Sequence, residues 1–208
     1  MLRQTSLLAA AAVLHLAGCA CISQSECQYS DWRAVGYEDG SLGRPAHDFG
    51  TYRKRCADHG VTPDFGAYQQ GREAGLIEYC QESRGFQEGS AGRSYASVCP
   101  ADSEVKFLYG YHDGRTLHEL ESGLRSTNRR LRNHEGRIKQ IDFELAEKTN
   151  ALIGVTTTRE ERLRLVVLAT QLAEERSTLK SEISDLLAQR EVLQAQLATA
   201  RQELLTKR

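Results

Sequence analysis

The chain has 208 residues, with 27 basic and 28 acidic side chains and a formal net charge of -1. A charge this close to zero gives no general attraction to nucleic acid, and we expect no nucleic-acid partner. The tryptophan, tyrosine, proline and cysteine residues all lie before residue 116, and only Phe143 is aromatic beyond it. This change of composition predicts a glycine-rich region over 27–115 and a helical region over 116–208.

The first residues have the pattern of a secretion signal. Arg3 supplies a positive charge, eleven mostly apolar residues extend from Leu7 to Ala17, and small residues precede Cys19. The apolar run is shorter than the roughly 20 residues that a permanent membrane-spanning helix needs, so we expect this segment to be cleaved. Residues 1–18 therefore resemble the signal peptide of a bacterial lipoprotein.

The motif Leu16-Ala17-Gly18-Cys19 resembles the cleavage site at which such proteins are lipidated. The resemblance implies that Cys19 receives a diacylglycerol on its thiol and a further acyl chain, such as palmitate, on its freed amine. More than one chain gives stable anchoring, whereas one chain is marginal. Ala20, and not Asp, follows the cysteine, which implies the outer membrane facing the periplasm, with 19–26 as a lipidated linker. The alternative is ordinary cleavage near Ala17 and release into the periplasm.

Four further cysteines are candidates for disulfides: Cys27, Cys56, Cys80 and Cys99. An even set in a small exported region indicates a disulfide framework, for which three connectivities are possible. We favour the pairs 27/56 and 80/99, because each would join neighbouring short helices. A zinc site is the competing interpretation, but no two of these cysteines have C-x2-C spacing, and we expect neither a metal nor a cofactor. Cys21 is either free, bridged to another molecule, or without a role in the linker.

Glycine pairs recur through the region 27–115. Gly36-Tyr37-Glu38-Asp39-Gly40 is matched by Gly110-Tyr111-His112-Asp113-Gly114, and the segments 71–75 and 89–92 are looser copies. Glycines four residues apart clear one stripe of a helix, so that another backbone can approach closely. The region is therefore predicted to be a small bundle of short helices stapled by disulfides.

Asp39 and Asp113 hold equivalent places in this match, and Arg72 and Arg115 lie nearby in sequence. Facing repeats would make these four side chains a polar site for a sugar or peptide of the cell wall. We favour the simpler interpretation that the charges satisfy helix ends and pair with one another. The histidines form neither a zinc-hydrolase motif nor a neighbour to a nucleophile motif, so we predict no catalytic residue and no enzymatic activity.

A longer succession of residues resembles a known family. It consists of Asp31-Trp32-Arg33, Gly36-Tyr37, Asp39-Gly40, Gly43-Arg44, Tyr52-Arg53-Lys54, Cys56, Gly60-Val61, Pro63-Asp64, Tyr68, Gly71-Arg72, Gly75-Leu76, Tyr79-Cys80, Val98-Cys99-Pro100, Gly110-Tyr111 and Gly114-Arg115. Over roughly 27–121 the chain is similar to a family of bacterial envelope lipoproteins that is catalogued as a domain of unknown function. The resemblance implies a location but no activity, ligand or catalytic residue.

Apolar residues in the region 116–208 follow a coiled-coil rhythm. The first stripe is Leu117, Leu120, Leu124, Leu131, Ile138, Ile141, Leu145 and Leu152, and the second is Leu165, Ala169, Leu172, Leu179, Ile183, Leu186, Leu193, Leu197, Ala200 and Leu204. Arg162, Arg176 and Arg190 interrupt the second stripe at core positions. We expect their charged ends to turn outward or toward nearby carboxylates.

The two stripes are separated by a glycine and a β-branched run, Gly154-Val155-Thr156-Thr157-Thr158, where the helix should break. Helices over 102–153 and 159–206 would have 52 and 48 residues, and such matched lengths favour an antiparallel hairpin with its turn near 154–158. A parallel dimer of extended helices is the alternative. The predicted fold class is therefore all-α, a stapled bundle of short helices followed by a long helical hairpin.

A two-helix arm leaves apolar residues such as Val166, Leu168 and Leu187 incompletely covered, so we expect self-association or an envelope protein partner. The arm also carries a basic cluster: Arg125, Arg129, Arg130, Arg132, Arg137 and Lys139. This cluster could bind an anionic polymer or lipid headgroups. We favour the alternative that it is a solvated face whose charges pair with acids of the other helix, as is more usual on a coiled coil. The sequence thus predicts a membrane-anchored structural or interaction protein. The alternative is a ligand-binding or wall-active module that the arm oligomerises.

Overall fold

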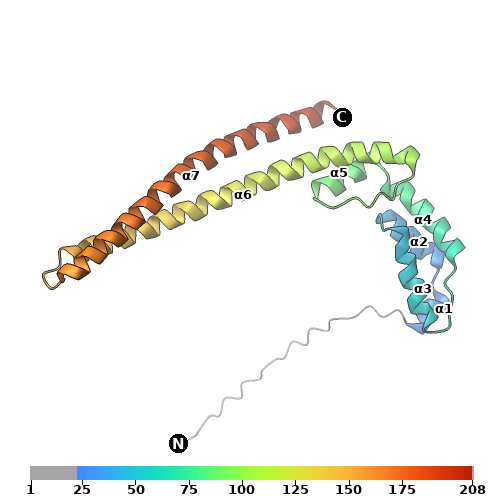
Figure 1. Ribbon diagram of the computed structural model, residues 1–208. Coiled ribbons are helices and arrows are strands. Elements are labelled where there is room, and N and C mark those ends of the chain that lie inside the picture. Colours follow the sequence, from blue (N-terminus) through green and yellow to red (C-terminus); the bar gives the residue numbers. More distant parts are fainter. Residues whose placement is uncertain (1–22, 208) are drawn as a thin grey trace, which may run out of the picture. The chain divides into compact units, whose positions relative to one another are not determined.

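A computed structural model of the chain describes residues 23–207, and every regular element in this range is a helix (Figure 1). The elements are α1 (Gln24–Tyr29), α2 (Trp32–Ser41), the 3-10 helix η1 (Ala46–Asp48), α3 (Phe49–Ala57), α4 (Phe65–Tyr79), α5 (Glu82–Ser90), α6 (Ala101–Leu152) and α7 (Arg159–Thr206). The predicted all-α class is confirmed. The signal peptide, Cys19 and Cys21 lie outside the described residues.

The chain divides into two compact units between Ile77 and Glu78. The sequence predicted a boundary between two regions near residue 116, where the composition changes. At that point α6 continues without a break, because the residues on both sides keep a helical pattern. None of the helices within 23–207 is long and apolar enough to cross a membrane.

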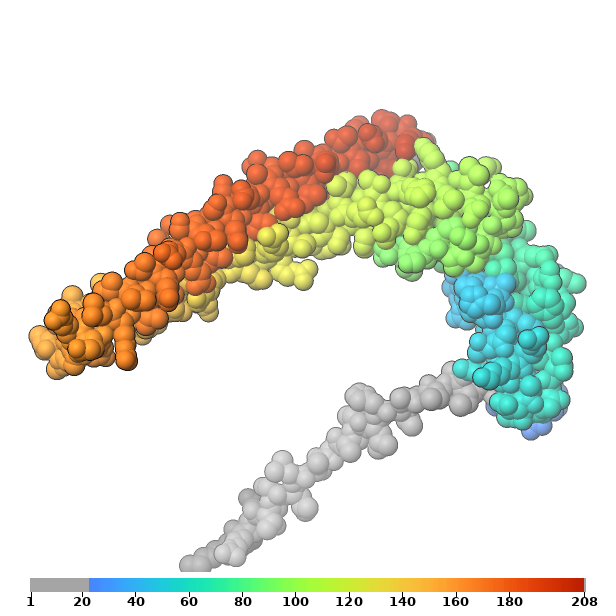
Figure 2. Space-filling model, viewed as in Figure 1, coloured from blue at the N-terminus to red at the C-terminus, as the bar shows by residue number. Residues whose placement is uncertain are grey.

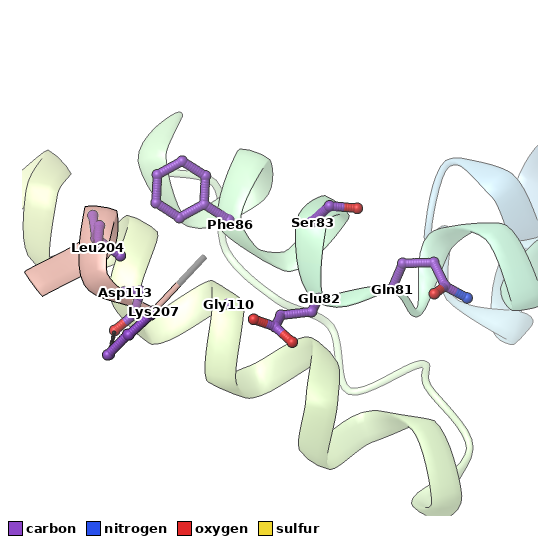
Figure 3. A pocket seen from close by; sticks show the side chains of 8 residues that line it. All are labelled: Gln81, Glu82, Ser83, Phe86, Gly110, Asp113, Leu204 and Lys207. Carbon is purple, nitrogen blue, oxygen red and sulfur yellow. Dashed lines mark hydrogen bonds and ion pairs between the residues drawn. The ribbon is translucent and has the colours of Figure 1, made fainter.

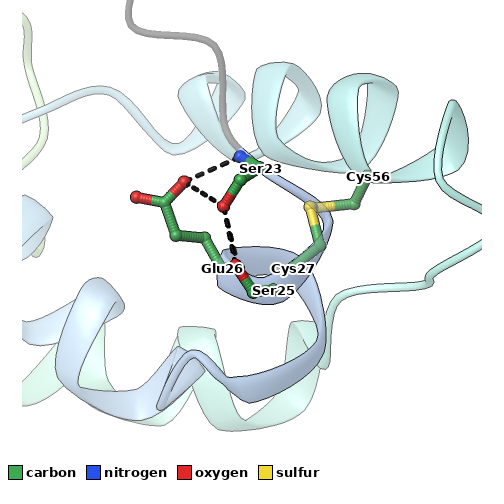
Figure 4. The surroundings of a disulfide bond; sticks show 5 residues. All are labelled: Ser23, Ser25, Glu26, Cys27 and Cys56. Atoms are coloured by element: carbon green, nitrogen blue, oxygen red, sulfur yellow. Dashed lines mark hydrogen bonds between the residues drawn. A yellow bond between two sulfur atoms is a disulfide. The ribbon is translucent and has the colours of Figure 1, made fainter.

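The first unit begins with a short helix that is capped at its start (Figure 4). In α1, the Ser23 Oγ accepts from the Glu26 backbone N–H at 3.2 Å, and the Glu26 carboxylate accepts from the Ser23 N–H at 2.7 Å. This reciprocal pair satisfies two backbone donors that a helix start otherwise leaves free. One residue further on, Cys27 forms a disulfide with Cys56 at the end of α3, and both cysteines are buried.

Aromatic rings form the core around this disulfide. The Phe49 ring lies 4.7 Å from the Tyr68 ring and 6.3 Å from the Trp32 ring, measured between centroids, and the contacts are tilted or edge-on. Such arrangements add to the gain from burying apolar area. A region with so few aliphatic side chains is thus held by rings and a covalent staple together.

Glycines let α2 and α4 touch backbone to backbone. A β-carbon on Gly36 or Gly40 of α2 would overlap the carbonyl oxygen of Tyr68 or Arg72, and one on Gly71 of α4 would overlap that of Arg33. Only glycine fits at these positions, because any side chain would push the helices apart. The predicted role of the paired glycines is therefore confirmed, and we call this contact a glycine clasp.

The second unit repeats the clasp between α5 and α6. Gly85 and Gly89 of α5 lie against the backbone of α6, and Gly110 and Gly114 of α6 lie against α5. Beside the clasp, the Phe107 ring is fully buried between Tyr79 and Tyr95, with centroids 5.1 and 4.6 Å away. A disulfide joins Cys80, just before α5, to Cys99, just before α6. Both predicted disulfide pairs are confirmed.

The remainder of α6 pairs with α7 as an antiparallel hairpin, and Figure 2 shows the two helices in contact along the arm. α6 has 52 residues and α7 has 48, as the stripes predicted, and the turn lies between Leu152 and Arg159. Thr158 caps α7, because its hydroxyl accepts from the Glu161 N–H at 3.2 Å. Ion pairs between the helices, such as Arg201 with Glu121 at 2.9 Å, fix the register. The hairpin is thus present within one chain.

Candidate functional site

The first unit contains one fully buried carboxylate. Asp39 in α2 is only 2% exposed and accepts hydrogen bonds from Arg44 Nη1 at 2.9 Å, the Tyr68 hydroxyl at 2.9 Å and the Tyr52 hydroxyl at 3.3 Å. The carboxylate raises the pKa of the Arg44 guanidinium, and burial raises the pKa of the Tyr68 and Tyr52 phenols. A buried charge is tolerated when it is paired and hydrogen-bonded in this way.

The second unit contains a matching buried carboxylate, Glu88 in α5, which is 7% exposed. Its oxygens lie 3.0 Å from Arg93 Nη2 and 3.1 Å from Arg84 Nε. The pairing with Glu88 raises the pKa of the Arg93 guanidinium. Both carboxylates therefore bind an arginine five residues further along the chain, where the helix has just ended.

The local sequences of these two clusters are copies of one another. Residues 36–44 read Gly-Tyr-Glu-Asp-Gly-Ser-Leu-Gly-Arg, and residues 85–93 read Gly-Phe-Gln-Glu-Gly-Ser-Ala-Gly-Arg. Both helices end at a glycine with positive φ, Gly43 at 68° and Gly92 at 72°. This ending turns the chain so that the arginine returns to the carboxylate. We call each copy a glycine-carboxylate motif.

In the structure, the residue that occupies the same place as Asp39 is therefore Glu88, and not Asp113 as the sequence match suggested. Asp113 lies on α6, the second helix of its clasp, and its place corresponds to that of α4 in the first unit. The sequence match was misleading because segments 36–40 and 110–114 share the residues Gly-Tyr-x-Asp-Gly. The true counterpart, 85–89, has Glu where the first segment has Asp, and so it is less similar in sequence. The carboxylate is conserved in chemistry between the two motifs, but its side-chain length differs.

The four residues of the predicted polar site fall into separate contacts in the two units. In the first unit, Arg72 Nη2 donates to the Arg44 carbonyl at 3.1 Å, beside the Asp39 cluster. In the second unit, Arg115 pairs with Glu119 at 3.0 Å, and Asp113 accepts from Nζ of Lys207, the residue after α7, at 3.0 Å. Arg115 and Asp113 are therefore each neutralised by an ion pair, whereas the contact of Arg72 is with a backbone carbonyl.

Asp113 and Lys207 also line a half-open pocket of about 430 Å³ within the second unit (Figure 3). The other lining residues come from α5, its preceding loop, α6 and α7: Gln81, Glu82, Ser83, Phe86, Gly110 and Leu204. The Asp113 carboxylate and the nearby Tyr109 hydroxyl raise the pKa of Lys207. The ionisable and hydroxyl groups of this lining are those of Glu82, Ser83, Asp113 and Lys207, and the last two bind each other.

The interior of the arm follows the predicted stripes and adds polar residues to them. Leu131, Ile141, Leu186 and Leu197 are buried, as their heptad positions indicate. Sequence reasoning missed Thr127, which is buried at an intermediate position where the rhythm calls for an apolar residue. The 3,4 spacing was the available signal, since it selects Thr127 whatever its polarity.

Charged side chains at the edges of the interface pair across it. Arg176, one of the expected core arginines, lies 2.6 Å from Asp142 on α6, so its charged end does turn to a carboxylate. Arg162 instead donates to the Gly154 carbonyl in the turn at 3.3 Å. Arg137 binds Glu175 through two nitrogens, which lowers the pKa of that carboxyl.

The basic cluster of α6 is only partly neutralised. Besides Arg137, Arg125 lies 3.7 Å from Glu121 on its own helix. The other four members are exposed and make no ion pair with any residue in the range 23–207: Arg129, Arg130, Arg132 and Lys139. The expected pairing with acids of the other helix therefore accounts for Arg137 but not for these four.

Apolar side chains are exposed close to the tip of the arm, in the first turns of α7. Leu163 is 62% exposed, Val166 50%, Val167 57% and Leu168 44%. Leu165, between them, belongs to the predicted second stripe and is half-buried. We call residues 163–168 the tip segment.

The comparisons with known proteins concern the part of the chain that holds both motifs. Residues 31–116 match the family described as Protein of unknown function (DUF2799). The expected resemblance to a family without an assigned function is thereby confirmed, over nearly the same residues. Neither the curated proteins nor the solved structures gave a significant match. The matched segment includes both glycine clasps and both buried carboxylates, and the rest of the arm lies outside it.

Proposed function

We propose that this protein is a lipid-anchored protein of the bacterial envelope that acts as a structural or interaction protein through its helical arm, and not as an enzyme. The motif ending at Cys19 supports the anchor. The disulfides 27/56 and 80/99 support an oxidising compartment such as the periplasm.

The observation that carries the proposal is the tip segment. Apolar side chains lie on more than one side of this part of α7, because Leu165 of the predicted stripe is half-buried while Leu163 and Val167 are exposed. Exposed apolar surface of this kind marks a place where another molecule binds.

The occupant that we propose is the tip segment of a second copy. A two-fold contact lets the same apolar patch cover itself, which is the commonest arrangement in soluble oligomers. Both signs of charge are present in and next to the tip segment, with Arg164 and Glu160 exposed beside Leu163. Two antiparallel copies can therefore place unlike charges opposite each other.

The buried carboxylates favour this role over that of a ligand-binding module. Asp39 receives three hydrogen bonds from its own unit, and Glu88 is bound by two arginines. Neither carboxylate has a free face for a sugar or peptide. Their placement suits a structural purpose, which leaves the arm as the surface for partners.

Sedimentation velocity tests the self-association with the full chain carrying Cys19→Ser, so that no lipid contributes. We expect a dimer that Val167→Lys dissociates. Val192→Lys is the matched control, because Val192 is also an exposed valine of α7, 56% exposed, but lies away from the tip. A monomer at all concentrations, or equal dissociation by both variants, would contradict contact at the tip.

The anchor is tested separately by mass spectrometry of the mature protein from bacterial membranes. We expect an amino-terminal peptide that begins at acylated Cys19, and loss of membrane association in Cys19→Ser. An unmodified mature start at Cys19, or recovery from the cytosol with free thiols, would refute the anchor without bearing on the arm.

A further inference from the structure

Five residues of α6 line up on the side of the helix that is turned away from α7. At 100° per residue, positions 125, 129, 132, 139 and 143 fall within a sector of about 80°. Leu131 and Ile141, which are buried against α7, lie on the opposite side. The five side chains are Arg125, Arg129, Arg132, Lys139 and Phe143, and all are exposed. We call this set the basic stripe.

The charges of the basic stripe are largely unneutralised. Within 23–207, Arg129, Arg132 and Lys139 make no ion pair, although Glu135 lies on the same stretch of helix. In contrast, Arg137 at the edge of the hairpin binds both Glu175 and Glu144. The arm thus pairs Arg137 at its interface and leaves three cations of the outer face available, since only Arg125 of the stripe has an ion pair, with Glu121.

An exposed aromatic ring continues the line of cations. Phe143 is 67% exposed and is the only aromatic residue beyond residue 116. Midway along the stripe, Gly136 has open space where a side chain would project. From Arg125 to Lys139 the stripe extends about 21 Å along a straight path at 1.5 Å per residue. A flat, extended counterpart can touch every member at once.

We propose that the basic stripe binds the surface of an anionic phospholipid bilayer, with the cations on the headgroups and the Phe143 ring in the interfacial layer. Clustered arginines and lysines are attracted to anionic lipid. An aromatic ring is favourable at the boundary between headgroups and acyl chains. A soluble polyanion would engage the charges but gain nothing from Phe143. The proposal goes beyond the proposed function and does not depend on the Cys19 anchor, since it concerns α6 alone.

Vesicle flotation with the full chain carrying Cys19→Ser tests this binding. The vesicles contain either equal parts of phosphatidylglycerol and phosphatidylcholine or phosphatidylcholine alone. We expect binding to the anionic vesicles that exceeds binding to the neutral ones and weakens with added salt. Equal binding to both vesicles, or binding to neither, would overturn the proposal.

A triple variant and its matched control locate the contact. Arg129→Gln/Arg132→Gln/Lys139→Gln should lose at least about tenfold in affinity for anionic vesicles. The control triple removes the same charge from exposed positions away from the stripe: Lys54→Gln, Arg159→Gln and Lys180→Gln. An equal loss in both triples would place the contact elsewhere and overturn the proposal. Far-ultraviolet circular dichroism confirms that each variant keeps its helices.

Phe143→Ser separates a bilayer from other polyanions. We expect this variant to bind anionic vesicles more weakly and to bind dextran sulfate as the parent chain does. If Phe143→Ser leaves vesicle binding unchanged, the contact is purely electrostatic and the choice of a lipid surface is wrong. Phe143 is exposed, so its loss should not disturb the hairpin core.

Discussion

Asp39 and Glu88 occupy the same position in two copies of one motif, three residues after the first glycine of a clasp and five residues before the arginine that each binds. In both copies that arginine follows a glycine with positive φ, which ends the helix. The carboxylate therefore joins the end of a helix to the loop that leaves it. The segment that matches the family model contains this joint twice.

Replacing Asp39 with asparagine should weaken the first unit. The substitution removes the charge that binds Arg44 and leaves an amide among hydroxyl donors, so we expect a loss of roughly 2–4 kcal/mol in the free energy of unfolding. Urea titration followed by Trp32 fluorescence measures the loss. The neighbouring Glu38 is exposed, and Glu38→Gln should change the unfolding midpoint little. Equal effects of the two substitutions would show that burial of Asp39 is unimportant.

The glycine clasp of the second unit can be tested against another glycine of the same helix. An alanine at Gly110 would overlap the Glu82 backbone, and we expect it to cost about 2 kcal/mol or more. At Gly136 a β-carbon meets open space, so alanine should stabilise α6 by up to about 1 kcal/mol. Thermal unfolding should therefore shift in opposite directions. A parallel shift would argue against backbone contact at Gly110.

The disulfide between Cys27 and Cys56 should contribute strongly, because it closes a loop with a sequence separation of 29 residues. In the chain-entropy model, such a loop is worth about 3–4 kcal/mol. We expect Cys27→Ser/Cys56→Ser to unfold at a correspondingly lower urea concentration. Peptide mapping without reductant should recover the two cysteines in one linked peptide. Recovery of Cys27 linked to Cys80 would contradict the fold.

Alkaline pH should destabilise the second unit through Tyr95. Burial raises the pKa of its phenol to about 12, and its hydroxyl donates to Glu104 and accepts from the Cys99 N–H. The folded pKa lies above the unfolded value of about 10. The resulting stability is complete below pH 10 and is lost as the pH rises toward about 12.

Stability curves between neutral and alkaline pH test this expectation. Tyr95→Phe should reduce the slope of the unfolding free energy against pH in that window. Tyr29 is 83% exposed, so Tyr29→Phe should leave the slope unchanged. If the two variants have equal slopes, ionisation of Tyr95 is not coupled to folding.

Two adjacent leucines of α7 test the hairpin. Leu186 is 3% exposed at a core position, and Leu186→Ala should cost about 3 kcal/mol. Leu187 is 36% exposed on the next position, and Leu187→Ala should cost less than about 1 kcal/mol. Helicity measured during thermal unfolding distinguishes the two. A larger cost at Leu187 would mean that α7 is rotated about its axis.

Much of this fold could be predicted because its strongest signals are periodic or covalent. Apolar residues every seventh position fix the facing sides of α6 and α7, and Gly154 with Thr158 marks the turn between them. The cysteine pairs followed from the placement of short helices. The paired glycines predicted close helix contact before any partner helix was known.

The contacts of individual polar side chains could not be predicted in the same way. The equivalence of Asp39 and Glu88 depends on which helix of a clasp carries the residue, and a sequence match does not reveal this. Likewise, the neutralisation of Arg137 but not of Arg132 depends on the angle at which each leaves α6 relative to α7. Such differences are set by tertiary register, and a one-dimensional charge pattern cannot distinguish them.

The joining of α6 to α7 by a turn of a few residues has a consequence for measurements on this protein. Their pairing is an intramolecular equilibrium, so dilution leaves it unchanged, unlike the assembly of a coiled coil from separate chains. Any dependence of helicity or melting temperature on protein concentration must then arise from contacts outside the α6–α7 seam. A simple dilution series thereby reports on higher assembly without a label or a crosslinker.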